Sequence, residues 1–155
     1  METQIDTLKS LAKSELFEIL NYWSFETIDE KNVGFIGEIG FNNNKNFDAT
    51  HGSVLHVRIF WSFSAFEITN DEKHKLLAKR AFDYIVSNFY DNQFGGIFWS
   101  INADGSPRET KNQIYAIAFT IYGLTEYYKI SKEKKALDLA IDLYKKIELH
   151  SYDNL

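Results

Sequence analysis

Apolar residues recur at helical spacing in three stretches of the chain, each of which keeps one polar face. The first stretch predicts a helix over about residues 3–23. The second covers residues 70–89, with Asn70 or Asp71 as its cap, and the third covers residues 131–148. Because each helix keeps a polar side, we expect these three helices to form an outer, solvent-facing layer.

Two other stretches, residues 51–66 and 111–128, are apolar on nearly every side, which is typical of buried helices. We expect them to form an inner layer. Arg58 lies in the middle of the first one, and a buried arginine is costly unless it is paired or functional. Two interpretations stay open, a structural clamp on a carboxylate or a cation facing a ligand pocket. His51 shares the stripe of Arg58 and can reach the rim of such a pocket, whereas His56 points the opposite way and is interpreted as structural.

Two glycine-containing loops lead from outer to inner helices, and they repeat. Asp29 precedes Gly34 by five residues and Asp91 precedes Gly96 by five, with 62 residues separating the two pairs. The same spacing added once more falls on Asp153. The unit is an amphipathic helix, a loop and an apolar helix, and stacked units of this size form helical-hairpin solenoids. We interpret both aspartates as loop-organising residues rather than catalytic acids.

This pattern predicts an all-α fold of helical-hairpin repeats with short β-hairpin-like loops, such as residues 97–101 and the turn at Asp104-Gly105. Residues 1–155 would hold about two and a half hairpins, since a third unit only begins at Asp153. We therefore expect an N-terminal fragment of a single larger domain, in which six units would need about 370 residues. Its inner helices would expose apolar faces that further repeats cover, so we expect the fragment to self-associate.

The composition of the chain limits which partners it can bind and in which cellular compartment we expect it. The net charge of −5 and the lack of a basic cluster argue against nucleic acid. No apolar run approaches the ~20 residues of a membrane span, and the first residues lack the layout of a signal peptide. With no cysteine, the chain is expected to be cytoplasmic. The sequence has no metal-spaced histidine set, phosphate-binding glycine loop or nucleophile elbow, so we expect no metal and no cofactor.

Candidate binding residues lie on the second apolar stretch. Tyr115, Phe119 and Tyr122 fall close to one face of the predicted helix, as does Lys111. Such a stripe either packs in a core or presents aromatic rings to the apolar face of a sugar, and both interpretations stay open. His74 stands at the polar start of the helix predicted over residues 70–89, where we expect it to be solvated.

The chain resembles the N-acylglucosamine 2-epimerase / cellobiose 2-epimerase family, and leans toward the cellobiose (or mannobiose) 2-epimerase branch. The matching segments follow one another along nearly the whole chain and are residues 34–35, 55–64, 95–99, 104–107, 111, 115–124 and 136–148. The resemblance implies an (α/α)6 barrel, or α/α toroid, with its site in the central cavity. Residues 1–155 would be the N-terminal fragment of this single catalytic domain.

The resemblance also implies a chemistry and an active enzyme. Family members epimerise C2 of a reducing-end sugar by removing and returning a proton through an enediolate. By resemblance, Arg58 stabilises the developing oxyanion and Tyr115 lines the sugar site, because fixed donors aimed at forming charge lower the barrier. The family's acid/base histidines are expected beyond Leu155, so the isolated fragment is expected to be inactive. The expected substrate-binding residues are Tyr115, Phe119, Tyr122 and His51.

Two alternative functions stay open. The same scaffold serves N-acylglucosamine 2-epimerases and simple aldose–ketose isomerases. A non-catalytic α/α repeat module, which binds a partner through its aromatic inner face, is the alternative from a different class.

Overall fold

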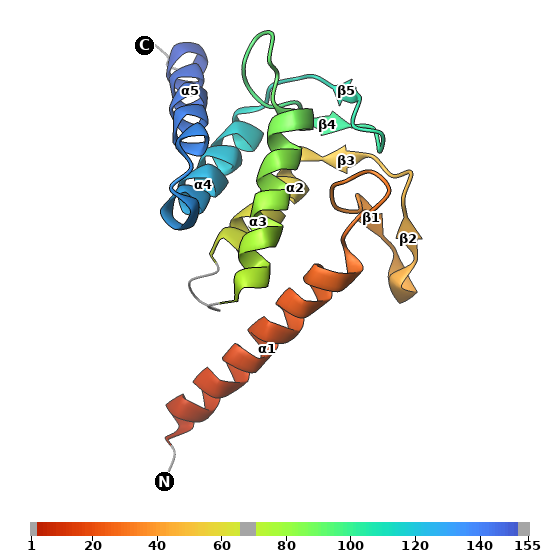
Figure 1. Cartoon of the computed structure of the whole chain (residues 1–155), viewed down its shortest axis with the longest axis vertical. Coiled ribbons are helices and arrows are strands. Elements are labelled where there is room, and N and C mark those ends of the chain that lie inside the picture. The colour runs from red at the N-terminus through yellow and green to blue at the C-terminus, as the bar shows by residue number, and fades with distance from the viewer. Residues whose placement is uncertain (1–2, 66–70, 152–155) are drawn as a thin grey trace.

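The computed structural model describes residues 3–65 and 71–151, in which groups of short strands separate the first helix from a pair of helices and that pair from a second pair (Figure 1). The helices are α1 (Gln4–Glu26), α2 (Ser53–Ser64), α3 (Glu72–Tyr84), α4 (Ile114–Ser131) and α5 (Lys134–Ser151). The strands are β1 (Glu38–Ile39), β2 (Lys45–Asn46), β3 (His51–Gly52), β4 (Ser100–Ile101) and β5 (Pro107–Glu109). The short segments η1 (Phe41–Asn43) and η3 (Ile85–Phe89) are a 3-10 turn and a π-helical continuation of α3. The predicted fold class, helical hairpins with short β-hairpin loops, is confirmed.

All five predicted helices are present, with ends shifted by a few residues. Thr3 forms a capping box with Asp6 at the start of α1, and this helix runs one turn further than predicted. α2 starts only after β3, which takes the first two residues of the predicted stretch. Asp71 caps α3 by accepting the backbone N–H of Lys73. Its alternative, Asn70, lies outside the described residues, as does residue 66 at the predicted end of the second helix.

The inner layer predicted from the apolar stretches is formed by α2 and α4, which pack side by side. α3 packs on α2 and α5 on α4, so these two amphipathic helices lie outside (Figure 1). Gly123 permits the close approach of the inner helices, because a Cβ there would lie 2.6 Å from the Phe60 ring. The buried rings of Phe82 and Tyr127, with centroids 4.9 Å apart, join α3 to α4.

α1 differs from the other amphipathic helices because most of its apolar stripe is uncovered. Its N-terminal half projects away from the remaining elements (Figure 1). Ile5, for example, is 63% exposed. Leu20 and Ser24, near the other end of α1, are its buried residues.

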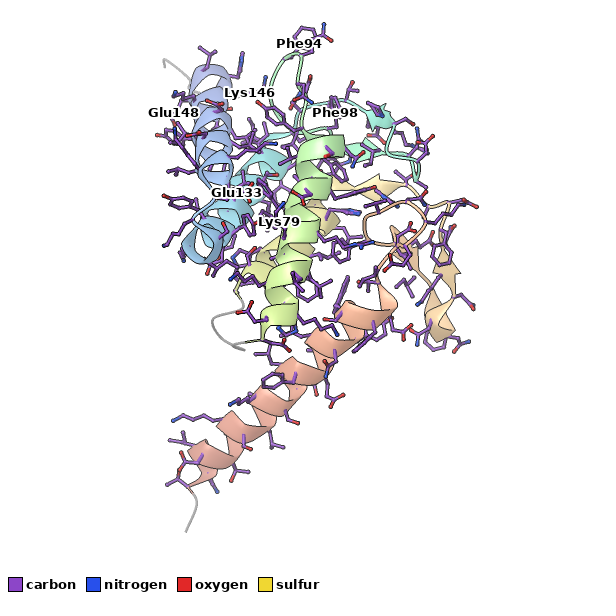
Figure 2. All side chains as sticks on the ribbon, in the orientation of Figure 1. Lys79, Phe94, Phe98, Glu133, Lys146 and Glu148 are labelled. Atoms are coloured by element: carbon purple, nitrogen blue, oxygen red, sulfur yellow. The ribbon has the colours of Figure 1, made fainter. Side chains whose placement is uncertain are left out.

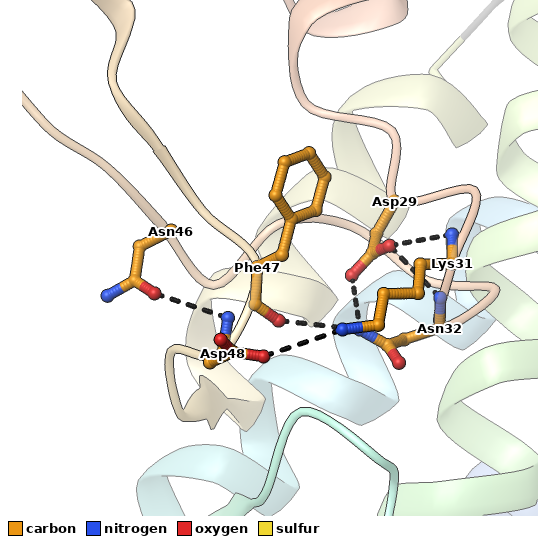
Figure 3. A network of polar contacts seen from close by, with 6 residues as sticks. All are labelled: Asp29, Lys31, Asn32, Asn46, Phe47 and Asp48. Carbon is orange, nitrogen blue, oxygen red and sulfur yellow. Dashed lines mark hydrogen bonds and ion pairs between the residues drawn. The ribbon is translucent and has the colours of Figure 1, made fainter.

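The two loops predicted to repeat have the same hydrogen-bond pattern, and Figure 3 shows the first of them. In each loop, the aspartate N–H donates to the carbonyl of the glycine five residues ahead, and its carboxylate accepts two backbone N–H groups. This confirms the loop-organising interpretation of both aspartates. The Asp29 N–Gly34 O and Asp91 N–Gly96 O distances are both 3.1 Å. Asp29 Oδ1 accepts the backbone N–H groups of Lys31 at 2.9 Å and Asn32 at 3.0 Å. Asp91 Oδ1 accepts those of Gln93 at 2.9 Å and Phe94 at 3.0 Å.

The hairpins that follow the loops extend the repeat. Ile39 pairs with Lys45 in the β1–β2 hairpin, and Ile101 pairs with Pro107 in the β4–β5 hairpin, each residue 62 positions from its counterpart. β3 pairs with β4, so the strand that leaves the first unit joins the hairpin of the second. Of the strand predicted over residues 97–101, only β4 is a regular strand.

Each loop is also held by a cation from the outer helix that comes next in the chain. Arg80 of α3 donates from Nη2 to the Asp29 carbonyl at 2.8 Å and from Nε to the Gly34 carbonyl at 3.3 Å. Lys146 of α5 donates to the Phe94 carbonyl at 2.8 Å, and Figure 2 shows the two side chains at the same end of the molecule. The carbonyls of the first loop are half-buried and need such donors, whereas the Phe94 carbonyl is exposed.

In the two described ranges, no helix is both long and apolar enough to cross a bilayer. The cytoplasmic location expected from the sequence stays a prediction.

The second loop provides a test of how tightly these turns are packed. Gly95 and Gly96 both have positive φ angles, of 70° and 97°. A Cβ at position 96 would lie 1.9 Å from Asn112 Oδ1, whereas the nearest atom at position 95 is the Tyr90 hydroxyl at 4.0 Å. We expect Gly95→Ala to lower the free energy of unfolding by about 1 kcal/mol, for the left-handed conformation alone. Gly96→Ala should lower it by about 3 kcal/mol, because strain and overlap add. If urea unfolding gave equal losses of unfolding free energy for the two variants, Asn112 would have to move aside to accommodate the new Cβ.

Candidate functional site

A groove of about 610 Å³ lies between α1 and α2, and its walls are mostly apolar. It exists because α1 stands away from the inner layer and leaves one side of α2 open. Arg58 is the charged residue of its lining. The groove is lined by Leu16, Ile19, Leu20 and Trp23 of α1, by Val54, Leu55, Arg58, Ile59, Trp61, Ser62 and Phe63 of α2, and by Ala65.

Arg58 is exposed, which corrects the expectation that it is buried in an apolar helix. The side of α2 that carries it faces the groove, where α1 does not cover it. Within the described part of the chain its guanidinium forms no ion pair, so the carboxylate clamp considered from the sequence does not form there. The cation therefore stands in an apolar wall, where it is available to an anionic or oxyanionic group.

Tyr115 and Tyr122 of the aromatic stripe of α4 lie at the surface, whereas Phe119 is half-buried and packs against the core. Tyr115 and Tyr122 are 56% and 53% exposed, and the Tyr115 ring contacts Phe119 at 4.8 Å between centroids. Tyr122 stacks on Trp61 of α2, with centroids 5.3 Å apart and planes 19° apart. Trp61 also lines the groove with Arg58, whereas no α4 residue belongs to that lining as described. Arg58 and Tyr115 thus lie on neighbouring inner helices without sharing one pocket.

His51 is fully buried, so the structure does not place it at the pocket rim expected from the sequence. Its Nδ1 lies 2.7 Å from the Tyr84 hydroxyl, and its ring stacks on His56 with centroids 5.0 Å apart. His56 in turn stacks on Tyr84 at 5.3 Å. Gly34 makes room for this stack, because a Cβ there would lie 2.6 Å from the Tyr84 ring. Sequence reasoning missed Tyr84, since its contact with His51, 33 positions away in the chain, has no local pattern.

His56 is the satisfied structural histidine predicted from the sequence. Its Nδ1 lies 3.0 Å from the Gly52 carbonyl and its Nε2 3.2 Å from the Phe35 carbonyl. Burial, with a smaller effect of the nearby His51, lowers the pKa of His56 to about 4, against the opposing effect of the two carbonyls. The neutral ring carries a single N–H, so only one of the two carbonyls accepts a hydrogen bond at neutral pH.

Burial also favours the neutral forms of His51 and Tyr84, the other two residues of this stack. It lowers the pKa of His51, against an opposing effect of Asp29, and raises the pKa of Tyr84 to about 12. Both side chains are therefore neutral at physiological pH. In this state they hold each other through a hydrogen bond between uncharged groups.

His74 is 2% exposed, so the expectation that it is solvated is wrong. Its ring lies 5.6 Å from that of Phe63, centroid to centroid, because the start of α3 packs against the end of α2. Burial lowers the pKa of His74. Among the described residues, no cluster of three or more His, Asp or Glu side chains is suited to a metal ion.

Comparison with known sequences gives a consistent set of relatives. Residues 34–154 match the model of a family described as N-acylglucosamine 2-epimerase (GlcNAc 2-epimerase). A cellobiose 2-epimerase of Bacteroides fragilis is 41% identical over 152 residues, which are 97% of this chain and 39% of the relative. One from Dictyoglomus turgidum is 37% identical over 142 residues, 88% of this chain and 36% of the relative. The chain thus spans about two fifths of the relatives it matches.

Solved structures agree in the fold. The cellobiose 2-epimerase from Bacillus thermoamylovorans B4167 matches with a TM-score of 0.86 and 30% identity, over 91% of this chain and 37% of that one. A D-mannose isomerase matches with a TM-score of 0.83 over 94% of this chain and 37% of its own. At 21% identity, the second likeness shows the fold alone.

Because its histidines are buried, we expect the stability of the protein to depend on pH. The folded-state pKa of His56 is about 4, below the ordinary 6.5, so its contribution to stability is complete above pH 6.5 and is lost as pH falls toward 4. Between pH 7 and 5 this group alone should cost about 2 kcal/mol of unfolding free energy. Urea unfolding at the two pH values measures the loss, with the exposed His150→Gln variant as control. A pH-independent free energy would contradict a neutral, buried His56.

Proposed function

Because the chain belongs to the N-acylglucosamine 2-epimerase family, we propose that it is the Arg58-bearing part of a sugar 2-epimerase. The enzyme would interconvert C2 epimers at the reducing end of a disaccharide such as cellobiose. The observation that carries this proposal is the 41% identity with the Bacteroides fragilis cellobiose 2-epimerase over 152 residues. Since the match covers 39% of that relative, the activity is proposed for a complete barrel to which residues 1–155 contribute the first helical hairpins.

The reaction needs a base, an acid and a stabilised oxyanion. In the open-chain sugar, a base removes the proton from C2, and the electron pair of the C–H bond forms the C1=C2 double bond. The former aldehyde oxygen then carries the negative charge of an enediolate. Return of a proton to the opposite face of C2 gives the epimer, and the electrons balance without any redox partner.

Arg58 is the residue we assign to the enediolate oxygen. It is exposed on an inner helix, it has no ion-pair partner in the described ranges, and apolar side chains surround it in the groove. A fixed cation in such a wall acts on forming charge more strongly than one in water. The hydroxyl of Tyr115, at the first turn of α4, is the second donor that we propose for the sugar.

The aromatic surface next to these donors suits a sugar ring. We propose that Phe119 and Tyr122 contact its apolar face, with Trp61 stacked behind Tyr122. Buried His51 reaches no ligand directly, so we propose for it only an indirect role. None of His51, His56 and His74 lines the groove as described, and the proton-transferring groups are therefore assigned to other parts of the barrel.

A chimeric enzyme tests the role of Arg58. Residues 1–155 replace the matching 39% of the Bacteroides fragilis enzyme, and cellobiose epimerisation is measured with solvent deuterium. We expect turnover with deuterium at C2. Arg58→Ala should lower kcat by about 100- to 1000-fold, since one oxyanion donor contributes ~3 kcal/mol, and should leave the thermal midpoint nearly unchanged.

Arg108, an exposed arginine on β5, is the matched control, and Arg108→Ala should retain full turnover. A folded chimera without activity would contradict the proposed function. An active chimera in which Arg58→Ala turns over normally would remove Arg58 from the mechanism.

Residues 1–155 alone are predicted to be inactive and to self-associate. The groove beside Arg58 and the α4 surface around Tyr122 leave apolar area in contact with water, which favours association. Light scattering should report species larger than the monomer, and cellobiose should stay unepimerised. A monodisperse monomer that epimerises the sugar would contradict both expectations.

A further inference from the structure

The buried stack of His51, His56 and Tyr84 is present only in the first of the two described repeats. The positions 62 residues ahead hold Gln113, Ala118 and Lys146. The second repeat nevertheless forms the same loop, the same hairpin and an inner helix. The repeat architecture therefore does not require the stack. What distinguishes the first repeat is that its inner helix carries Arg58.

The stack has an energetic cost that its partners do not fully offset. His51 Nε2 is buried without a hydrogen-bond partner among the described residues. His56, as a neutral ring, satisfies one of the two carbonyls that it faces. A buried polar group left unpaired destabilises the fold, so the hydrogen bonds of the stack do not by themselves account for its presence.

The geometry shows what the stack controls. His56 and Arg58 are two residues apart on α2, so their side chains project about 200° apart around the helix axis. The ring of His56 is held against the Phe35 carbonyl on the loop side, which turns Arg58 toward the groove. The 2.7 Å contact of His51 with the Tyr84 hydroxyl ties β3, the residues just before α2, to α3. α2 is thus fixed against rotation from both its first turn and its entering strand.

We propose that His51, His56 and Tyr84 form a positioning unit that sets the rotation of α2 and so aims Arg58 at the reacting sugar. The proposal rests on the proposed function, because its consequence for catalysis passes through Arg58. The three residues are positioning residues and do not contact the substrate. They act on the sugar oxyanion only through Arg58, because they set the rotation of α2.

The test uses the same chimera and the Tyr84→Phe variant, which removes the hydroxyl but keeps the stacked ring. We expect kcat to fall about tenfold with KM little changed, because the guanidinium acts on charge that forms in the transition state. In the Arg58→Ala background, Tyr84→Phe should have no further effect on kcat. Lys146→Met, at the equivalent position of the second repeat, is the control and should lower the thermal midpoint while retaining kcat.

The outcomes separate the two proposals. An inactive but folded parent chimera overturns the proposed function. A further tenfold fall of kcat when Tyr84→Phe is added to Arg58→Ala overturns the positioning unit. Hydrogen exchange on residues 1–155 gives an answer that needs no activity. Tyr84→Phe should speed exchange over residues 53–62 more than over α4, whereas Lys146→Met should not. Equal acceleration over both helices would overturn the positioning role.

Discussion

The backbone hydrogen bond that closes each connecting loop is the constraint on which the packing of the helices depends. A loop between two helices has carbonyl and N–H groups that must find partners before apolar faces can meet. Here the aspartate N–H and the glycine carbonyl, 3.1 Å apart in both repeats, close the loop on itself. The aspartate carboxylate takes the remaining N–H groups at its tip. The chain then leaves in the direction that seats α2 or α4 in the inner layer.

The inner helices use that placement in different ways. α4 buries its face against α2 through Gly123, whereas the corresponding side of α2 is open and carries Arg58. An arginine is tolerated in this apolar wall because its head group reaches water in the groove. The same helix thus combines a core contact on one side with an available cation on the other, and this combination supports the chemistry proposed for it.

Much of the fold could be predicted from the sequence because the relevant signals are local. Helical periodicity placed all five helices, and the spacing of Asp29, Gly34, Asp91 and Gly96 identified the repeat before any contact was known. Side-chain environment could not be predicted in the same way. His74 stands in a polar stretch, yet it is buried by Phe63, and Arg58 stands in an apolar stretch, yet it is exposed. Both environments are set by how α2 meets other helices, which a local pattern does not record.

The cations that hold the loops also make each loop depend on the outer helix that follows it in the chain. The carbonyls of the first loop are satisfied by Arg80, and a carbonyl of the second by Lys146, each about fifty residues downstream. The half-buried carbonyls of the first loop therefore have these donors only when α3 is packed in place. The Phe94 carbonyl is exposed and can bond water when Lys146 is absent. Loss of α3 would accordingly leave polar groups of the first loop without partners, whereas loss of α5 would cost the second loop an exposed contact.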